Sequence, residues 1–404
     1  MKIVRFGELY DIPTSNGVSR PNSVRGKGFH MINMGELFAH NIINEMPMER
    51  VELSDKEQKK FFVKKGDLLF ARQSLVAAGA GKCSIVNNIA EPTTFESHLI
   101  RVRLDEQRCC SLYYFYLFQL SNNPIKAIVN QCAQAGIRGS ELQKIKVPYI
   151  PLCNQYRVAS ILSAYDSLIE NNTKRIHLLE QMAENLYKEW FVRFRFPGYE
   201  NTEFVDGLPK GWIISRLENY GRIETGKTPS MDKQEYYGGC LLFIKTPDMH
   251  GNMFVTDTSE TLSSIGHKTQ PKKLLPRYSI MVSCIGSGGV VAINAKEGHT
   301  NQQINSIILS DKRDLEWLYY TCKSLKPTIE LYGATGATMT NLSKKKFERL
   351  KVITPPKDIR IAFHDKMNSV FEQILSLTYR NSILIRQRDL LLPRLMSGKL
   401  EVKA

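Results

Sequence analysis

An internal repeat constrains the fold of this chain more than any other feature of its sequence. The segment at 64–86, KKGDLLFARQSLVAAGAGKCSIV, resembles the segment at 275–294, LPRYSIMVSCIGSGGVVAIN. In both, a strand-like run is followed by a loop of small residues and a second strand-like run. Two further pairs match in the same order, IRGSELQKIKVPYIP with MTNLSKKKFERLKVITPP, and FGELYDIPTSNG with RLENYGRIETGK. The sequence therefore predicts two copies of one mixed α/β domain.

Each copy ends in a long helical segment that follows a proline boundary. Apolar residues recur there at alternating spacings of three and four, the pattern of a coiled-coil seam. The first seam comprises Leu162, Tyr165, Ile169, Asn172, Ile176, Leu179, Ala183, Leu186 and Trp190. The second comprises Met367, Val370, Ile374, Leu377, Asn381, Leu384 and Leu391, with Arg388 as an irregularity. Two amphipathic helices packed on their own domains are the alternative, but the strict heptad of the first segment favours helix against helix.

Each seam contains one asparagine, Asn172 or Asn381. A single polar seam residue commonly sets helix register at some cost in stability, which indicates a structural and not a catalytic role. At 1.5 Å per residue, a helix over 155–190 would be roughly 54 Å long, which exceeds one turn of DNA at about 34 Å. Pro393 is expected to end or kink the last helix.

One motif points to a different function. GRIETGKTPS at 221–230 matches the phosphate-binding loop pattern G-x-x-x-x-G-K-[ST] from Gly221 to Thr228. Such a loop needs a buried strand before it and a helix after it. The preceding WIISRLENY alternates like a half-exposed strand, and Pro229 with MDKQEYYGG predicts no helix. The first copy carries no such lysine. A P-loop NTPase acting on nucleic acid is therefore the alternative function, and not the favoured one.

Composition narrows the remaining classes. Lys and Arg number 55 against 40 Asp and Glu, a formal charge of +15, which favours a polyanionic partner such as nucleic acid over a merely soluble basic protein. The eight cysteines form no C-x-x-C pair, so neither a zinc site nor a disulfide framework is expected. No stretch resembles a signal peptide or a membrane span, so we expect a cytoplasmic protein without a membrane partner. The H-E-x-x-H and G-x-S-x-G motifs and the Asn-Pro-Pro-aromatic signature of amino-methyltransferases are absent.

The whole chain resembles the specificity subunit of type I restriction-modification systems. The most specific parts are PLCNQYRVASILSAYDSLIENNTKRIHLLEQMAENLYKEWF at 151–191, similar to the central helical region of that family, and LLLPRLMSGKLEV at 390–402, similar to its closing segment. GKTPS followed by EYYGG resembles the opening of its recognition domains, and GDLLFAR resembles their middle. The second copy departs from this pattern, because YSIMVSC leaves no arginine opposite Arg72.

The resemblance implies an α+β protein with two mixed target-recognition domains joined by two long antiparallel helices, in a pseudo-two-fold repeat. The implied ranges are 1–150 and 198–355 for the recognition domains, and 151–197 and 356–404 for the helical spacers. Such a subunit reads a bipartite double-stranded DNA target and directs methyltransferase and restriction subunits, two of each. It has no catalytic residue, metal or cofactor of its own, because S-adenosylmethionine, ATP and Mg²⁺ belong to those partners.

Residues that contact bases must be polar and must lie in loops that reach a groove edge. We predict DNA contacts from Arg72, Gln73, Ser74 and Arg138 in the first copy and from Lys227, Thr228, Ser287, Thr338 and Asn341 in the second. The run Lys344, Lys345 and Lys346 is expected to face phosphates or solvent. The aromatic run at 113–116 is expected to be part of a core helix and not a base-stacking platform, because WLYY at 317–320 matches it.

Three functional classes remain: a scaffold that recognises DNA sequence, an NTPase, and a DNA-cutting or DNA-modifying enzyme with a cryptic site. Binding of ATP by the purified chain would identify the second class. Cleavage that depends on a divalent metal, or methyl transfer by the isolated chain, would identify the third.

Overall fold

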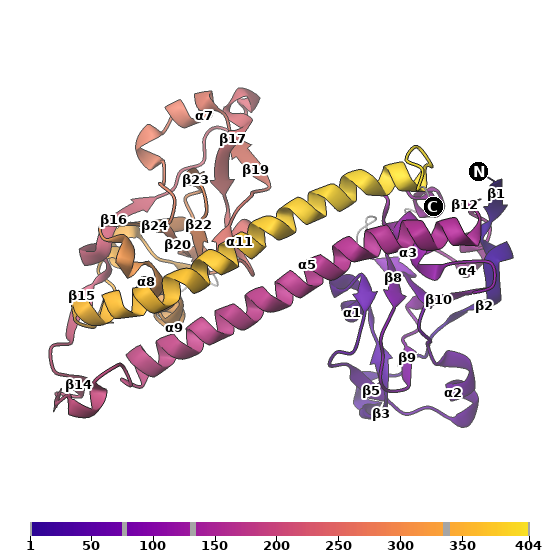
Figure 1. The fold of residues 1–404 in the computed structure, drawn as a ribbon, viewed down its shortest axis with the longest axis horizontal. Coiled ribbons are helices and arrows are strands. Elements are labelled where there is room, and N and C mark those ends of the chain that lie inside the picture. The colour runs from indigo at the N-terminus through magenta and orange to yellow at the C-terminus, as the bar shows by residue number, and fades with distance from the viewer. Residues whose placement is uncertain (1, 75–78, 130–134, 334–339, 403–404) are drawn as a thin grey trace. The chain divides into compact units, whose positions relative to one another are not determined.

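The computed structural model describes residues 2–74, 79–129, 135–333 and 340–402, and Figure 1 labels many of its elements. The chain divides into two compact units. The first unit combines Met1–Leu168 with Leu384–Ala404, and the second is Ile169–Ile383. Each unit therefore contains one copy of the repeat and a part of each long helix.

The first unit is built around a five-stranded sheet whose neighbours are β2 (Tyr10–Asn16), β10 (Leu99–Leu104), β6 (Leu68–Ala71), β8 (Cys83–Val86) and β4 (Ile42–Ile43). A three-stranded sheet follows the order β5 (Glu49–Val51), β3 (Arg25–Ile32) and β9 (Thr93–Phe95). Two ribbons pair β1 (Lys2–Arg5) with β12 (Lys146–Tyr149), and β7 (Gln73–Ser74) with β11 (Ala135–Gly136). The short helices are α1 (Met34–Ala39), α2 (Asp55–Phe61), α3 (Ser111–Gln119) and α4 (Gly139–Leu142).

The second unit repeats this arrangement strand for strand. Its five-stranded sheet has the order β16 (Gly221–Thr225), β24 (Ile304–Leu309), β20 (Ile280–Ser283), β22 (Val291–Asn294) and β18 (Phe254–Val255). The three-stranded sheet is β19 (Glu260–Leu262), β17 (Tyr237–Ile244) and β23 (Gly298–Thr300), and the ribbons are β15 (Ile213–Arg216) with β26 (Lys351–Thr354) and β21 (Ile285–Gly286) with β25 (Thr340–Asn341). The helices are α6 (Thr246–Met249), α7 (Ser264–Lys268), α8 (Leu315–Ser324), α9 (Lys326–Gly333) and α10 (Lys344–Glu348). A hairpin of β13 (Phe204–Val205) and β14 (Leu208–Pro209) precedes this copy.

The aromatic runs lie in the hydrophobic cores, as predicted. All four aromatic residues at 113–116, in α3, are at most 2% exposed, and the four residues at 317–320, in α8, are at most 4% exposed. Burial of an aromatic side chain contributes a large share of core stability. These rings are therefore inaccessible to a nucleic-acid base.

The two long helices are α5 (Leu152–Tyr187), which continues as a π-helix over Lys188–Val192, and α11 (Lys357–Met396). They run antiparallel within each unit. In the second unit Tyr187 packs against Phe363 while Asn172 contacts Asn381. In the first unit Leu162 shares a core with Leu392, Leu395 and Met396. Pro393 was expected to end or kink α11; it does not end the helix, which continues past it to Met396. A proline so close to the carboxyl end leaves only one internal turn to disturb, and its own carbonyl still accepts a hydrogen bond from Ser397 N–H at 3.1 Å.

The irregular seam residue, Arg388, has a partner on the facing helix. Its guanidinium donates to Asp166 Oδ1 at 2.6 Å, and the hydroxyl of Tyr116 in α3 donates to Asp166 Oδ2 at 2.6 Å. Burial and the hydrogen bond to this carboxylate raise the pKa of Tyr116 well above its ordinary value. The contact connects both long helices to the core helix of the first copy.

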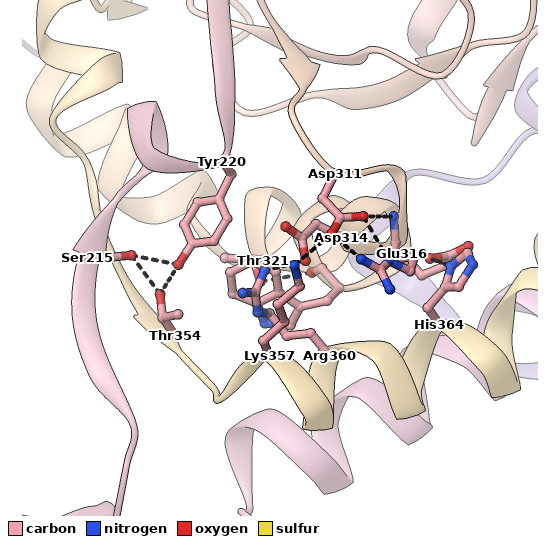
Figure 2. A network of polar contacts seen from close by, with 12 residues as sticks. Ser215, Tyr220, Asp311, Asp314, Glu316, Thr321, Thr354, Lys357, Arg360 and His364 are labelled. Atoms are coloured by element: carbon pink, nitrogen blue, oxygen red, sulfur yellow. Dashed lines mark hydrogen bonds and ion pairs between the residues drawn. The ribbon is translucent and has the colours of Figure 1, made fainter.

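A different polar network attaches the start of α11 to the second copy (Figure 2). Arg360 forms an ion pair with Asp314, and Lys357 lies 3.3 Å from Asp311. His364 Nδ1 lies 2.7 Å from the fully buried Glu316, whose burial raises the pKa of that carboxyl. Ser215, Tyr220 and Thr354 form a triangle of hydroxyl contacts between ribbon β15–β26 and the 3₁₀ turn that follows β15.

Candidate nucleic-acid interface

The four residues predicted to contact DNA in the first copy lie together around one ribbon. Gln73 and Ser74 form β7, which pairs with β11 in the register Ala135↔Ser74 and Gly136↔Gln73. Arg72 directly precedes this strand, and its carbonyl accepts a hydrogen bond from Ile137 N–H at 2.9 Å. Arg138 comes next in the chain and is exposed. A short ribbon of this kind places polar side chains of two distant segments at one surface.

The second copy builds the equivalent ribbon from β21 and β25. Asn341 lies opposite Ile285, and the exposed Ser287 directly follows β21. Thr338 lies outside the described residues. Cys284 occupies the position in the second copy that Arg72 occupies in the first, and it is buried. This position therefore presents a cation in the first copy and none in the second.

Lys227 and Thr228 follow β16 and lie beside a loop at 301–303 that sequence reasoning missed. Lys227 N–H donates to Thr300 O at 2.9 Å, and the Thr228 hydroxyl donates to Gln302 Oε1 at 2.7 Å. On its other side the loop reaches the ribbon, because Cys284 N–H donates to Gln303 O at 2.7 Å. The loop thus brings the two predicted groups of the second copy to one surface. The signal that could have revealed it is the run of three amide side chains, NQQ, between two strands.

The geometry of the GKT segment is incompatible with a phosphate-binding loop. Residues Gly221–Thr225, which would form the loop, are strand β16, paired along its length with β24. Gly226 N–H donates to Ile304 O at 3.1 Å and Lys227 N–H donates to Thr300 O, so neither amide is available to a phosphate. In place of a helix, a turn and a 3₁₀ segment at Gln234–Tyr236 lead into β17. The structure therefore gives no support to the NTPase alternative.

The glycine of this motif has a packing reason that both copies share. A Cβ on Gly226 would lie 2.2 Å from Asn301 O, and one on Gly17 would lie 1.9 Å from Phe95 O. Only glycine permits such a close approach of two backbones. The next residue differs, because Val18 is buried while Lys227 is exposed, although both donate their N–H to the equivalent carbonyl at 2.9 Å. The fold therefore requires the glycine and leaves the residue after it free to vary.

Positive charge lies close to the ribbon of the second copy. Lys344, Lys345 and Lys346 begin α10, three residues beyond Asn341, and all are exposed. Lys344 lies 3.7 Å from Glu348, a weak exposed pair. Three exposed ammonium groups at one helix end suit contact with phosphates and carry no sequence information.

A buried histidine, His299, lies two residues before the first residue of the loop at 301–303. His299 Nε2 lies 3.1 Å from His267 Nδ1, and His299 is fully buried. Burial, together with the charge of His267, lowers the pKa of His299 to about 4. The ring is therefore neutral near pH 7.

Among residues 2–74, 79–129, 135–333 and 340–402, no group of three or more His, Cys, Asp or Glu is arranged to hold a metal ion. Within the same part of the chain, no helix is both long and apolar enough to span a membrane.

Known proteins are similar to this chain in sequence and in fold. The model of the type I restriction modification DNA specificity domain matches residues 1–181 and 209–382. The specificity subunit of the HindI type I restriction enzyme of Haemophilus influenzae is 31% identical, over 85% of this chain and 88% of that protein. The MjaIX specificity subunit of Methanocaldococcus jannaschii is 26% identical, over 72% of this chain and 69% of that protein. The crystal structure of a type I restriction-modification S subunit from M. genitalium superposes with a TM-score of 0.62 at 12% identity, covering 98% of this chain and 95% of that one.

Proposed function

This chain belongs to the family of type I restriction-modification DNA specificity subunits, and we propose that each of its two copies recognises one half of a split DNA target. Proteins of this family recognise DNA and are not catalysts.

The observation that supports it most is one scaffold carrying two different sets of loop residues. The five-stranded sheets share one strand order, β2-β10-β6-β8-β4 and β16-β24-β20-β22-β18. At equivalent backbone positions, however, Val18 is replaced by Lys227 and Arg72 by Cys284. Because base identity is read by side chains at groove edges, identical scaffolds with different loops should recognise different half-sites.

The proposed contacts to bases come from the loops described above. In the first copy these are Arg72, Gln73, Ser74 and Arg138, and in the second Lys227, Thr228, Ser287, Thr338 and Asn341. The dispersed excess of lysine and arginine, and the exposed lysines that begin α10, would contact phosphates and position each copy on the duplex.

We further propose that the chain acts by directing partner subunits, two that methylate adenine and two that carry motor and nuclease activity. S-adenosylmethionine, ATP and Mg²⁺ would be bound by those partners, in the cytoplasm. The names of the relatives support this, since both are specificity subunits of restriction enzymes. Large apolar side chains exposed on the long helices also support docking of a protein there: Leu168, Leu178, Met182, Ile383 and Leu390.

The test is an exchange of one copy. Residues 198–355 are replaced by the matching segment of a related subunit of known target, the chimera is produced with its methylating partner, and methylated adenines are mapped in the host genome. Contacts in separate grooves are roughly additive, so we expect one half-site to change and the other to persist. A wholly new target, or loss of partner binding by a folded chimera, would contradict separate recognition.

A further inference from the structure

Gln303 is held in a single orientation that leaves only its amide nitrogen available. Building on the DNA recognition proposed above, we propose that Gln303 determines specificity in the second half-site by donating to the acceptor atoms of a guanine. The residue lies in the loop at 301–303, between the GKT segment and ribbon β21–β25, and is partly buried.

The orientation follows from a backbone donor. Gln303 N–H donates to Asn301 Oδ1 at 3.2 Å, and a backbone N–H can only donate, so this contact identifies the oxygen of the Asn301 amide. The nitrogen of Asn301 must then be the atom that donates to Gln303 Oε1, at 3.1 Å. The Thr246 hydroxyl donates to the same oxygen at 3.3 Å. Both lone pairs of Gln303 Oε1 are therefore occupied.

The two N–H groups of Gln303 Nε2 have no hydrogen-bond partner in the described part of the chain. This nitrogen lies 3.8 Å from the position that a Cβ would take on Gly286, in the strand that precedes Ser287. Gly286 has φ of +79°, where glycine is strongly favoured, and its lack of a side chain leaves the nitrogen open on that side. The donor thus faces the same ribbon that carries Ser287 and Asn341.

Occupation of the oxygen changes which base this glutamine can recognise. A free glutamine commonly recognises adenine, because its oxygen accepts from N6 while its nitrogen donates to N7. Here the oxygen is engaged, and the remaining group is a pair of donors. Guanine presents two neighbouring acceptors, N7 and O6, in the major groove, whereas adenine places its own N6 donor beside N7. The geometry therefore assigns a G·C pair to Gln303.

The first copy supplies a matched control at the equivalent backbone position. His98 O accepts from Arg72 N–H at 2.8 Å, just as Gln303 O accepts from Cys284 N–H. His98 is exposed, and its side chain differs in shape and in hydrogen-bonding pattern. A substitution of His98 should therefore affect the first half-site and spare the second.

The test uses the full chain with its methylating partner and maps methylation over a library of target variants. We expect Gln303→Leu to reduce discrimination about 10- to 100-fold at one G·C pair of the second half-site. Gln303→Glu replaces the Nε2 donor by an oxygen acceptor. It should therefore reverse the preference at that same pair, away from the acceptors of guanine. Asn301→Ala frees the amide to rotate and should admit A·T at that pair. Thermal unfolding and binding of non-specific DNA are measured for each variant as controls for correct folding.

The outcomes distinguish the role of Gln303 from the recognition of a split target on which it rests. If the wild type methylates a split target but Gln303→Leu and Gln303→Glu leave every position of the second half-site unchanged, the role of Gln303 is refuted and split recognition stands. An affected pair that is A·T in the wild-type target refutes it as well. If the wild type directs methylation to an unsplit target, the proposed function itself fails.

Discussion

The side chain of Asn172 donates from Nδ2 to Oδ1 of Asn381 at 2.9 Å, so the polar residues of the two seams meet in the second unit. Asn381 Nδ2 in turn donates to Thr173 Oγ1 at 3.2 Å. A paired amide at a seam satisfies both partners in only one register, because a shift along either helix would place each amide against apolar side chains.

This relationship predicts the response of the helices to substitution. Asn172→Ala should lower the free energy of unfolding by about 1 kcal/mol, since it leaves the partly buried Oδ1 of Asn381 without its donor. Replacing both asparagines by leucine should restore or exceed wild-type stability, because two apolar residues pack across a seam. Urea unfolding measures both effects.

The neighbouring Asn171 is exposed and provides the matched control. Asn171→Ala should change stability by less than about 0.5 kcal/mol. Equal effects of Asn171→Ala and Asn172→Ala would show that the pair contributes nothing to stability.

A second prediction concerns Lys227. Because its backbone N–H and that of Gly226 are already bonded, we expect calorimetry to detect no ATP binding by the wild type. Lys227→Ala should weaken DNA binding. If the ammonium group contacts a phosphate, the salt dependence of binding should decrease by about one ion; if it contacts a base, discrimination should fall by about 1–3 kcal/mol at one position of one half-site.

Lys399, exposed near the carboxyl end, is the control for a general loss of charge. Lys399→Ala should leave half-site preference unchanged. ATP affinity that is present in the wild type and lost in Lys227→Ala would restore the nucleotide interpretation.

The third prediction is a pH dependence of the second copy. The pKa of His299 is lowered from 6.5 to about 4, so on acidification the unfolded chain takes up this proton before the folded chain does. The lowered pKa of His299 contributes to the free energy of unfolding. This contribution is fully present above about pH 6.5 and is lost as pH falls toward 4, at no more than about 1.4 kcal/mol per pH unit. Thermal unfolding between pH 7 and pH 5 should show this loss, and His299→Gln should reduce the slope.

His250 is exposed and serves as the comparison. His250→Gln should retain the wild-type slope over the same range. A slope that is identical in wild type and His299→Gln would show that His299 does not titrate differently in the two states.

A fourth prediction tests whether the helices set the distance between half-sites. The ranges 167–173 and 381–387 are one heptad each. They contain the contacts of Asn381 with Asn172 and Thr173, and they leave the neighbouring Asp166–Arg388 contact in place. Deleting both removes about 10 Å of helix, or roughly three base pairs at 3.4 Å each, and preserves the seam phase. Methylation mapping should show a shorter spacer between unchanged half-sites. An unaltered spacer in a folded, active complex would show that the helices do not set this distance.

Much of the architecture could be predicted from the sequence, because its signals are local or repeated. The seam through Leu162, Ile169 and Ile176 follows from spacing alone, since the apolar face of a helix depends on residues three and four apart. The repeat predicted two mixed domains, and the structure has the same strand order twice. The aromatic run at 113–116 was recognisable as core because its counterpart recurs in the second copy.

The decisive details of the candidate interface required the tertiary structure. The residues that flank GKT already disfavoured a phosphate-binding loop, but the hydrogen bonds of the Gly226 and Lys227 amides to Ile304 and Thr300 are visible only in the structure. Arg388 interrupts the apolar seam in the sequence, and the structure places Asp166 opposite it. Likewise, Asn301 and Thr246 fix the single orientation of the Gln303 amide. The physical reason is common to all three. A hydrogen-bonding group is defined by its partner, and partners such as Asp166 and Arg388, or Thr246 and Gln303, are far apart in the chain and meet only when it folds.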